Sequence, residues 1–215
     1  MKRNEFNLQR FIVTAKRQLY NYKFGGTEDE KSALNAVLTF RRYRNGMTSA
    51  ADASKCIVDF LIDWRMARAG ISHGYSEKWL LKNLKSLRQK VSRIGFGKKI
   101  ENFDVTNSKN TETVKKLFDT LAMNLVEKKI QPTAASKVLF VMAPKLFPMW
   151  DIGIGAVMGC NHNAEGYIAY MLKMKWLLKN PKVRRIHISE KNYRLRAFES
   201  ILWKMYSTSK TFRKG

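Results

Sequence analysis

The chain has 215 residues, 45% of them hydrophobic, and carries 41 Lys and Arg against 17 Asp and Glu, which gives a formal net charge of +24. This hydrophobic content is sufficient for a packed core and excludes a wholly disordered chain. The length fits one compact domain, or two small helical lobes that share a core and flank a cleft. We expect residues 1–206 to form this domain and residues 207–215 to form a basic flexible tail.

The positive charge indicates an anionic partner, because so large an excess repels itself within a compact fold. Nucleic acid, and double-stranded DNA in particular, is the leading candidate, since contacts with phosphates release counterions. An anionic membrane surface is the minor alternative. A lysine-rich proteome, as in some thermophiles, would normally raise glutamate as well, and acidic residues are scarce here.

The N-terminal sequence MKRNEFNLQRF lacks the apolar segment of a signal peptide. The apolar runs are too short to span a bilayer. The two cysteines, Cys56 and Cys160, are far apart and form no disulfide framework. We therefore expect an intracellular protein of the cytoplasm or nucleoid that is reduced, monomeric and not bound to a membrane.

Long amphipathic segments and only four prolines predict an all-α fold of about eight or nine helices. Thr27 with Glu30 predicts a capping box, and Asn110, Asn163 and Ser189 are further expected N-caps. The expected helices cover residues 5–22, 28–45, 49–69, 76–94, 110–129, 132–143, 152–159, 163–179 and 189–206. Residues 95–110 between them are expected to form a loop.

Basic residues gather in three places that could contact phosphates. The cations of Arg41-Arg42-Tyr43-Arg44 either complement the dipole of the helix that they end or contact phosphates beside a stacking tyrosine. The loop Gly95–Lys99 either brings backbone N–H groups to phosphates or is an ordinary surface connection. The densest basic tract lies between Lys173 and Arg196. The predicted nucleic-acid-binding residues are Arg41, Arg42, Arg44, Lys98, Lys99, Lys182, Arg184 and Arg185.

The sequence lacks the usual motifs for metals, nucleotides and catalytic triads. Cys160 and His162 are close, but no second pair has the spacing of a zinc site. The acidic residues are sparse, whereas metal-dependent nucleases need clustered carboxylates. We therefore expect no metal and no cofactor.

One lysine and one aspartate stand out in the most apolar part of the chain, PTAASKVLFVMAPKLFPMWDIGI, at residues 132–154. Lys137 lies on an apolar helix, where reduced hydration favours the neutral, nucleophilic amine. Asp151 follows a turn that contains Pro144 and Pro148, and it can cap the next helix and stay ionised. Two helices folded back to back would place both side chains on one rim. Alternatively, Lys137 extends to solvent and Asp151 is only a cap.

This stretch resembles the helix–hairpin–helix DNA glycosylase superfamily. Pro132 matches the proline of the family's hairpin, and Lys137 lies at the same offset from it as the catalytic lysine of the bifunctional members. Asp151 with Ile154 matches the Asp-x-x-Val/Ile signature of the catalytic aspartate. Thr133 and Ala135 stand where the family has the two hairpin glycines.

The resemblance implies a DNA repair glycosylase with associated abasic-site lyase activity. Such an enzyme flips a damaged or mismatched nucleotide out of the duplex. Lys137 would attack the sugar C1′ and form a Schiff base, and Asp151 would stabilise the cationic sugar. Trp64, Phe140 or Trp150 could stack on the base or belong to the core. The alternatives are a non-catalytic helical DNA- or RNA-binding protein and a subunit of a nucleoprotein complex.

Overall fold

The computed structural model describes residues 6–69, 76–126, 130–188 and 193–211. All regular elements in these residues are helical, which confirms the predicted all-α fold. In chain order they are α1 (Leu8–Gln18), α2 (Glu28–Arg44), α3 (Ala50–Ala69), α4 (Glu77–Ile94), the 3₁₀ helix η1 (Ile100–Asn102), α5 (Ser108–Asn124), α6 (Pro132–Met142), α7 (Ile152–Met158), α8 (Ala164–Lys179), α9 (Pro181–Arg184) and α10 (Arg194–Thr211).

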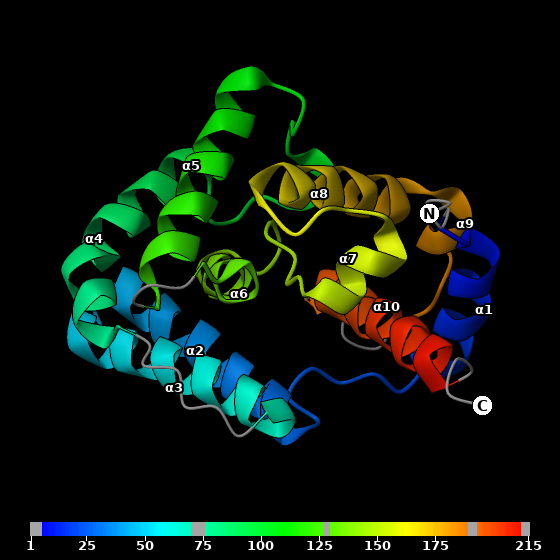
Figure 1. Ribbon diagram of the computed structural model, residues 1–215, viewed down its shortest axis with the longest axis horizontal. Helices are drawn as coiled ribbons and strands as arrows, with labels where there is room; N and C mark the ends of the chain where they lie inside the picture. The colour runs from blue at the N-terminus through cyan, green and yellow to red at the C-terminus, as the bar shows by residue number, and fades with distance from the viewer. Residues whose placement is uncertain (1–5, 70–75, 127–129, 189–192, 212–215) are drawn as a thin grey trace.

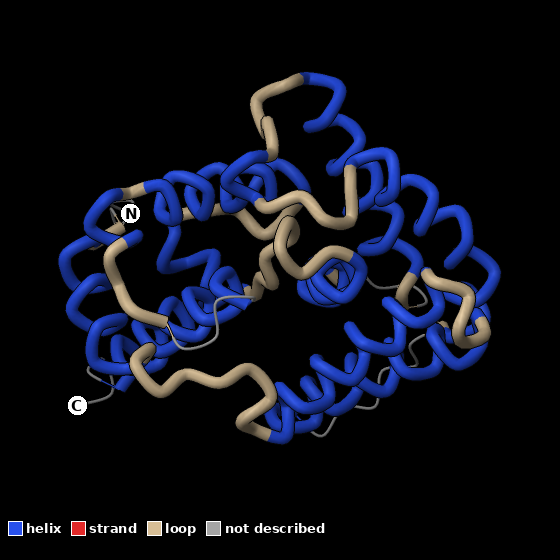
Figure 2. Tube along the Cα trace, turned by 180° about the vertical axis from the view of Figure 1, so that it is seen from behind, coloured by secondary structure: helices blue, strands red, loops and turns tan. Residues whose placement is uncertain are grey.

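The helix α6 lies at the centre of the molecule. Figure 1 shows α6 end-on, with α2, α3, α4 and α5 on one side and α1, α7, α8, α9 and α10 on the other, and Figure 2 shows the same arrangement from behind. All residues from Ala134 to Met142 are buried. A helix that is apolar nearly all round is stable only where neighbours cover every side, and α2, α3 and α5 pack directly against it.

One continuous core joins the two groups of helices. It contains Phe11 of α1, Phe40 of α2, Leu84 of α4, Phe140 of α6 and Phe198 of α10. The described chain is therefore a single compact domain. No helix in the described residues is both long and apolar enough to cross a membrane.

Several helix starts follow from short polar side chains, as predicted. The side chains of Thr27 and Asn163 accept hydrogen bonds from the backbone N–H groups of Glu30 and Gly166. Glu30 does not complete a capping box, however. Its carboxylate accepts a hydrogen bond from the Tyr22 hydroxyl at 2.9 Å and pairs with Arg196, because it is buried and these groups surround it.

Several boundaries differ from the sequence expectation, among them the end of α1, which is Gln18 instead of residue 22. Asn107, not Asn110, caps α5, while Asn110 binds the Asp104 carbonyl. A short helix, α9, interrupts the expected surface crossing after Asn180. The last helix continues to Thr211, beyond residue 206, where the flexible tail was expected to begin. The expected cap Ser189 lies outside the described residues.

The longer α10 has local support from hydroxyl groups. Ser207 and Thr208 both donate to the Lys204 carbonyl within the helix, and Arg10 of α1 donates to the Thr208 hydroxyl at 3.2 Å. These hydrogen bonds stabilise the helical conformation of residues that were expected, from their composition rich in Ser, Thr and Lys, to form a flexible tail.

Candidate functional site

A pocket of about 240 Å³ contains both residues that the sequence singled out. Lys137 enters its wall from α6 and Asp151 from the start of α7. Five separate parts of the chain supply the lining: Thr27, Asp29, Glu30, Trp64, Lys137, Met149, Trp150, Asp151, Ile154, Arg196, Ser200 and Trp203. The structure thus brings Lys137 and Asp151 to one cavity, as the back-to-back arrangement predicts.

Lys137 is a buried lysine, with only 7% of its surface exposed. Its Nζ atom lies 5.0 Å from the centre of the Trp64 ring, and the guanidinium carbon of Arg196 lies 5.1 Å from the same ring. Cations at this distance are attracted by the negative face of an indole. Trp64 therefore fixes two positive groups at the edge of the pocket.

Asp151 is the N-cap of α7, as predicted. Its Oδ1 atom accepts a hydrogen bond from the Ile154 backbone N–H at 2.8 Å. The helix N-terminus favours a negative charge at this position. The side chain is half-buried, so the carboxylate is held in the pocket wall with its orientation set by the helix.

A hydroxyl group ties the two candidate residues together through their neighbours. The Ser136 Oγ atom, fully buried, accepts a hydrogen bond from the Trp150 N–H at 3.0 Å. It also lies 2.9 Å from the Trp150 carbonyl and 2.8 Å from the Thr133 carbonyl, either of which can accept its proton. The start of α6 is thereby fixed to the segment that ends at Asp151.

Other side chains hold the rest of this segment, which has no regular secondary structure. The Tyr167 hydroxyl donates to the Pro148 carbonyl at 2.9 Å, and the Tyr170 hydroxyl donates to the Met149 carbonyl at 3.2 Å. The Met149 N–H donates to Glu199 Oε1 at 2.7 Å. Buried backbone groups need such partners, and α6, α8 and α10 provide them here.

Glu199 belongs to a buried ionic cluster behind the pocket. Arg196 lies 3.6 Å from Glu30 Oε1 and 3.6 Å from Glu199 Oε2. Burial raises the pKa of the Glu199 carboxyl to about 8, although Arg196 and the Met149 N–H act in the opposite direction. Burial likewise raises the pKa of the Tyr22 hydroxyl well above its ordinary value. Sequence reasoning missed this cluster, because long-range packing brings Glu30 of α2 to Arg196 and Glu199 of α10.

The three aromatic candidates occupy different environments. Trp64 is half-buried and lines the pocket. Trp150 also contributes to the lining but is only 1% exposed, and its ring stacks on Tyr170. Phe140 is completely buried, packs edge-on against Phe24 and does not line the pocket, so it is a core residue in this structure.

Among the described residues, the site contains neither the glycine hairpin typical of the helix–hairpin–helix glycosylases nor a group of metal ligands. Residues 132–135 are the first turn of α6, with Pro132 at its start and Ala135 fully buried. His162 binds Thr133 at 3.2 Å and contacts Trp150, and burial lowers the pKa of its imidazole. No cluster of three or more potential metal ligands occurs within the described ranges.

The comparison with known families decides the membership of the chain. A family model described as "Family of unknown function (DUF6308)" matches residues 29–205. The chain belongs to the DUF6308 family. The matched span contains the whole of the segment from Pro132 to Asp151 and most of α10. No curated protein and no solved structure matches the chain.

The predicted phosphate-binding residues of this DUF6308 protein do not form one surface. Arg41 and Arg44 line a second pocket, between α2 and the end of α6. Arg42, Lys98 and Lys99 are exposed, and Lys98 lies 6.0 Å from the centre of the Phe103 ring.

The remaining three predicted residues lie on or beside α9. Lys182, Arg184 and Arg185 are all exposed. Arg194 lies nearby but turns inward, donating to the Val183 carbonyl at 2.8 Å. Figure 1 shows α9 at the opposite side of the molecule from α4, so this basic tract is separate from the Arg41 region.

Sequence reasoning missed several residues around both pockets. Arg93 and Lys145 join Arg41 and Arg44 in basic cavities. Ser136 and Glu199 position the Asp151 segment. The position of Ser136, directly before the candidate lysine, was a usable signal for its role. Glu199 is one carboxylate among the charged residues of a terminal helix, and its burial depends on long-range packing.

Proposed function

We propose that this protein is a DNA repair glycosylase with abasic-site lyase activity, in which Lys137 is the nucleophile and Asp151 the stabilising carboxylate. The observation that carries the proposal is that both side chains line one pocket of about 240 Å³. A buried amine beside a helix-capping carboxylate and an indole is a suitable arrangement for chemistry at a cationic sugar.

The pocket lining suits a nucleoside rather than a phosphate group. Asp29, Glu30 and Asp151 contribute three carboxylates, against the two cations Lys137 and Arg196. Carboxylates repel phosphates but can accept hydrogen bonds from the amino groups of a base. Trp64 supplies an aromatic wall for an extruded base. The phosphates of the strand would then bind elsewhere on this basic protein.

In the proposed reaction, the neutral amine of Lys137 bonds to C1′ while the glycosidic C1′–N bond breaks, and the departing base takes up a proton. Opening of the sugar ring leaves a protonated imine between Nζ and C1′. Loss of a proton from C2′ then expels the 3′ phosphate by β-elimination, and water releases the lysine. Asp151 stabilises the positive charge on the sugar and assists proton transfer.

Borohydride trapping tests this proposal. Reduction of the imine on duplex DNA with an abasic site should produce a covalent protein–DNA adduct, which Lys137→Ala should abolish. Lys109→Ala, a change of an exposed lysine on α5, is the matched control and should leave trapping unchanged. The absence of an adduct across a panel of abasic and damaged duplexes, with DNA binding intact, would rule out the lyase.

The second candidate function is a non-catalytic helical nucleic-acid-binding protein. Its specific support is that both residues also have structural explanations, since Lys137 lies over Trp64 and Asp151 caps α7. In that case Lys137→Ala and Asp151→Asn would alter binding only in parallel with stability.

A further inference from the structure

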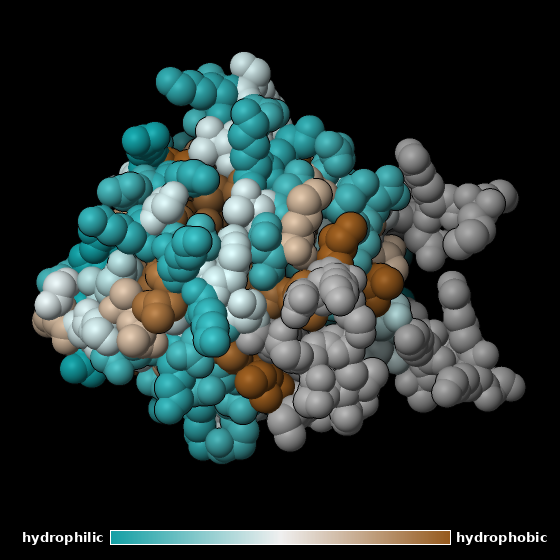
Figure 3. Space-filling model, turned by 60° about the vertical axis from the view of Figure 1, so that its left-hand side comes forward, coloured by the Kyte–Doolittle hydropathy of each residue, from teal (hydrophilic) through white to brown (hydrophobic). Residues whose placement is uncertain are grey.

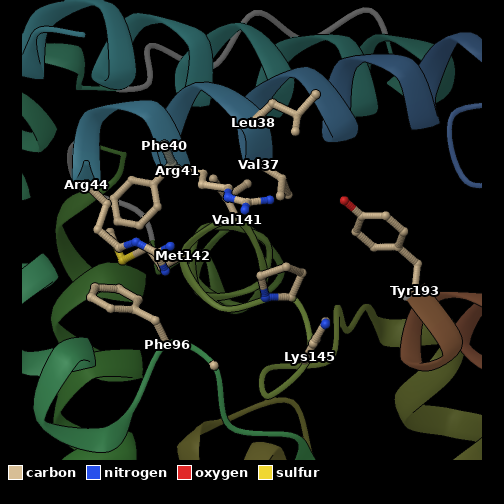
Figure 4. A pocket seen from close by; sticks show the side chains of 12 residues that line it. Val37, Leu38, Phe40, Arg41, Arg44, Phe96, Val141, Met142, Lys145 and Tyr193 are labelled. Atoms are coloured by element: carbon tan, nitrogen blue, oxygen red, sulfur yellow. The ribbon is translucent and has the colours of Figure 1, made fainter. Parts of the chain in front are cut away.

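A second pocket, of about 370 Å³, lies between α2 and the end of α6. Its volume falls within the range of small-molecule sites, about 300–1,000 Å³. Figure 4 shows Arg41 and Arg44 directed toward it from α2, with Lys145 and the Tyr193 hydroxyl on the opposite side. The pocket thus has cations on two sides.

No carboxylate among the described residues balances the positive charge of this pocket. Its lining includes Arg41, Arg44 and Lys145 and no acidic residue. Within the described part of the chain, none of these three side chains forms an ion pair with a carboxylate. Three cations around one concavity repel one another, and a bound anion would reduce that repulsion.

Aromatic rings lie directly beside the cations. The Arg44 guanidinium is 4.9 Å from the centre of the Phe96 ring, and the Phe96 and Phe40 rings are 6.1 Å apart. Val141 and Met142 add an apolar wall. Phe96 is half-buried, so part of its surface remains available to a planar ligand.

The pocket continues into a more open basic groove. Arg44 and Phe96 also line a neighbouring cavity of about 580 Å³, whose other residues are Arg88, Gln89, Ser92 and Arg93. Arg88 donates to the Arg44 carbonyl at 3.5 Å, and its guanidinium is 5.4 Å from the centre of the Tyr43 ring. The end of α2, the end of α4 and the loop at Phe96 therefore form one surface of alternating arginines and rings.

We infer that this surface binds the nucleoside phosphate units of an unpaired polynucleotide strand. One phosphate contacts Arg41, Arg44 and Lys145, while its base lies against Phe96 and the wall of Val141 and Met142. The next phosphates of the strand lie along Arg88 and Arg93. Arginine beside an aromatic ring suits both the phosphate and the base, since a guanidinium forms bidentate hydrogen bonds with phosphate and an aromatic ring can stack on any base.

The inference rests on the proposed function only in choosing nucleic acid as the anion. The two pockets are complementary, because the Lys137 pocket has three carboxylates in its wall and this one has none. A strand held here would have its phosphates away from the carboxylates of the Lys137 pocket.

Fluorescence anisotropy with a labelled oligothymidylate tests the inference. The double variant Arg41→Gln/Arg44→Gln should weaken binding at least tenfold and reduce the slope of log affinity against log salt by about 0.7 for each lost phosphate contact. Phe96→Leu, which keeps an apolar side chain but removes the ring, should weaken binding about tenfold through lost stacking. A matched duplex should compete less well than the single strand.

The control is Lys16→Gln/Arg17→Gln, which removes the same charge from the exposed end of α1. It should change affinity by less than about twofold, since distant surface charges are screened. Equal weakening by the two double variants would overturn the inference, and so would an unchanged affinity in Phe96→Leu. Competition by thymidine monophosphate would show that one free unit suffices, whereas competition by the oligomer alone would show that the open groove contributes.

Circular dichroism melting of each variant separates lost binding from lost folding. The assay involves no turnover, so a failure of borohydride trapping at Lys137 would leave this result unaffected.

Discussion

The Trp150 N–H donates a hydrogen bond of 3.0 Å to Ser136 Oγ, deep in the protein interior. Lys137 directly follows the serine and Asp151 directly follows the tryptophan. This buried hydrogen bond therefore contributes directly to the spacing of the two side chains that line the pocket. Its loss would affect the candidate site even though neither partner is itself a candidate for catalysis.

Ser136→Ala should destabilise the fold by about 1–3 kcal/mol, because the buried Trp150 N–H would lose its partner. Ser54→Ala is the matched control. Ser54 is also fully buried, but its hydroxyl has no hydrogen-bond partner in the described residues, so its removal should be neutral or stabilising. Urea denaturation of both variants measures the difference. Equal stabilities would mean that the hydroxyl at 136 contributes no more than the one at 54.

Glu199 should make stability depend on pH. Its folded-state pKa, about 8, lies above its ordinary value of 4.5, so the folded protein binds more protons than the unfolded chain between these values. Stability should therefore fall as pH rises from about 4.5 to about 8. Glu199→Gln, which cannot titrate, should lack this component. Denaturation curves of both proteins at several pH values in this range measure it, and parallel pH profiles would contradict the assignment.

Two substitutions at Asp151 distinguish its role as a helix cap from a role in catalysis. Asparagine is as good an N-cap as aspartate, whereas alanine costs about 0.5–2 kcal/mol. Asp151→Asn should therefore keep the thermal stability of the protein, and Asp151→Ala should lower it. If the carboxylate is catalytic, both variants should lose strand cleavage at an abasic site. An Asp151→Asn protein with full cleavage activity would contradict a catalytic role for this carboxylate.

Gly153 permits the close packing of α7 against α10. A Cβ atom at this position would lie 2.5 Å from Tyr206 Cδ1 and 2.8 Å from Trp203 Cζ3. Gly153→Ala should consequently destabilise the protein by about 1–3 kcal/mol through overpacking. Gly97→Ala is the control, because nothing lies within 4 Å of a Cβ atom there. Thermal melting compares the two, and a wild-type melting temperature for Gly153→Ala would show that the rings move aside freely.

The basic residues near α9 should contribute to duplex binding if DNA contacts both sides of the protein. Lys182, Arg184 and Arg185 are exposed, so replacing all three by glutamine should preserve stability. The slope of log affinity against log salt on duplex DNA should fall by about 0.9 for each phosphate contact removed. Titration at several salt concentrations measures the slope. An unchanged slope would place these residues outside the DNA interface.

Local patterns were sufficient to predict most helices and the positions of the main candidates. Thr27 and Asn163 cap helices because short polar side chains reach nearby N–H groups. The apolar surroundings of Lys137 and the capping geometry of Asp151 also depend on neighbouring residues alone. These features could be read from the sequence since each involves a short span of chain.

Long-range packing determined what the sequence did not reveal. Glu199 meets the Met149 N–H across 50 residues, and Arg88 reaches the Arg44 carbonyl across 44. Nothing in the local composition distinguishes a carboxylate that will be buried from one that will face water. The burial of Phe140 could not be predicted for the same reason, because α6 is apolar nearly all round and its sequence does not show which face lines the pocket.

The segment from Pro148 to Trp150 keeps its shape through side chains that belong to other parts of the protein. Ser136, Tyr167, Tyr170 and Glu199 supply its hydrogen bonds, and these bonds go to the main chain. The side chain of Met149 takes no part in them, so it can be exchanged for another residue of similar size while the path of the chain is preserved. The orientation of Asp151 should therefore tolerate an exchange at position 149 better than changes in the three helices that supply these hydrogen bonds.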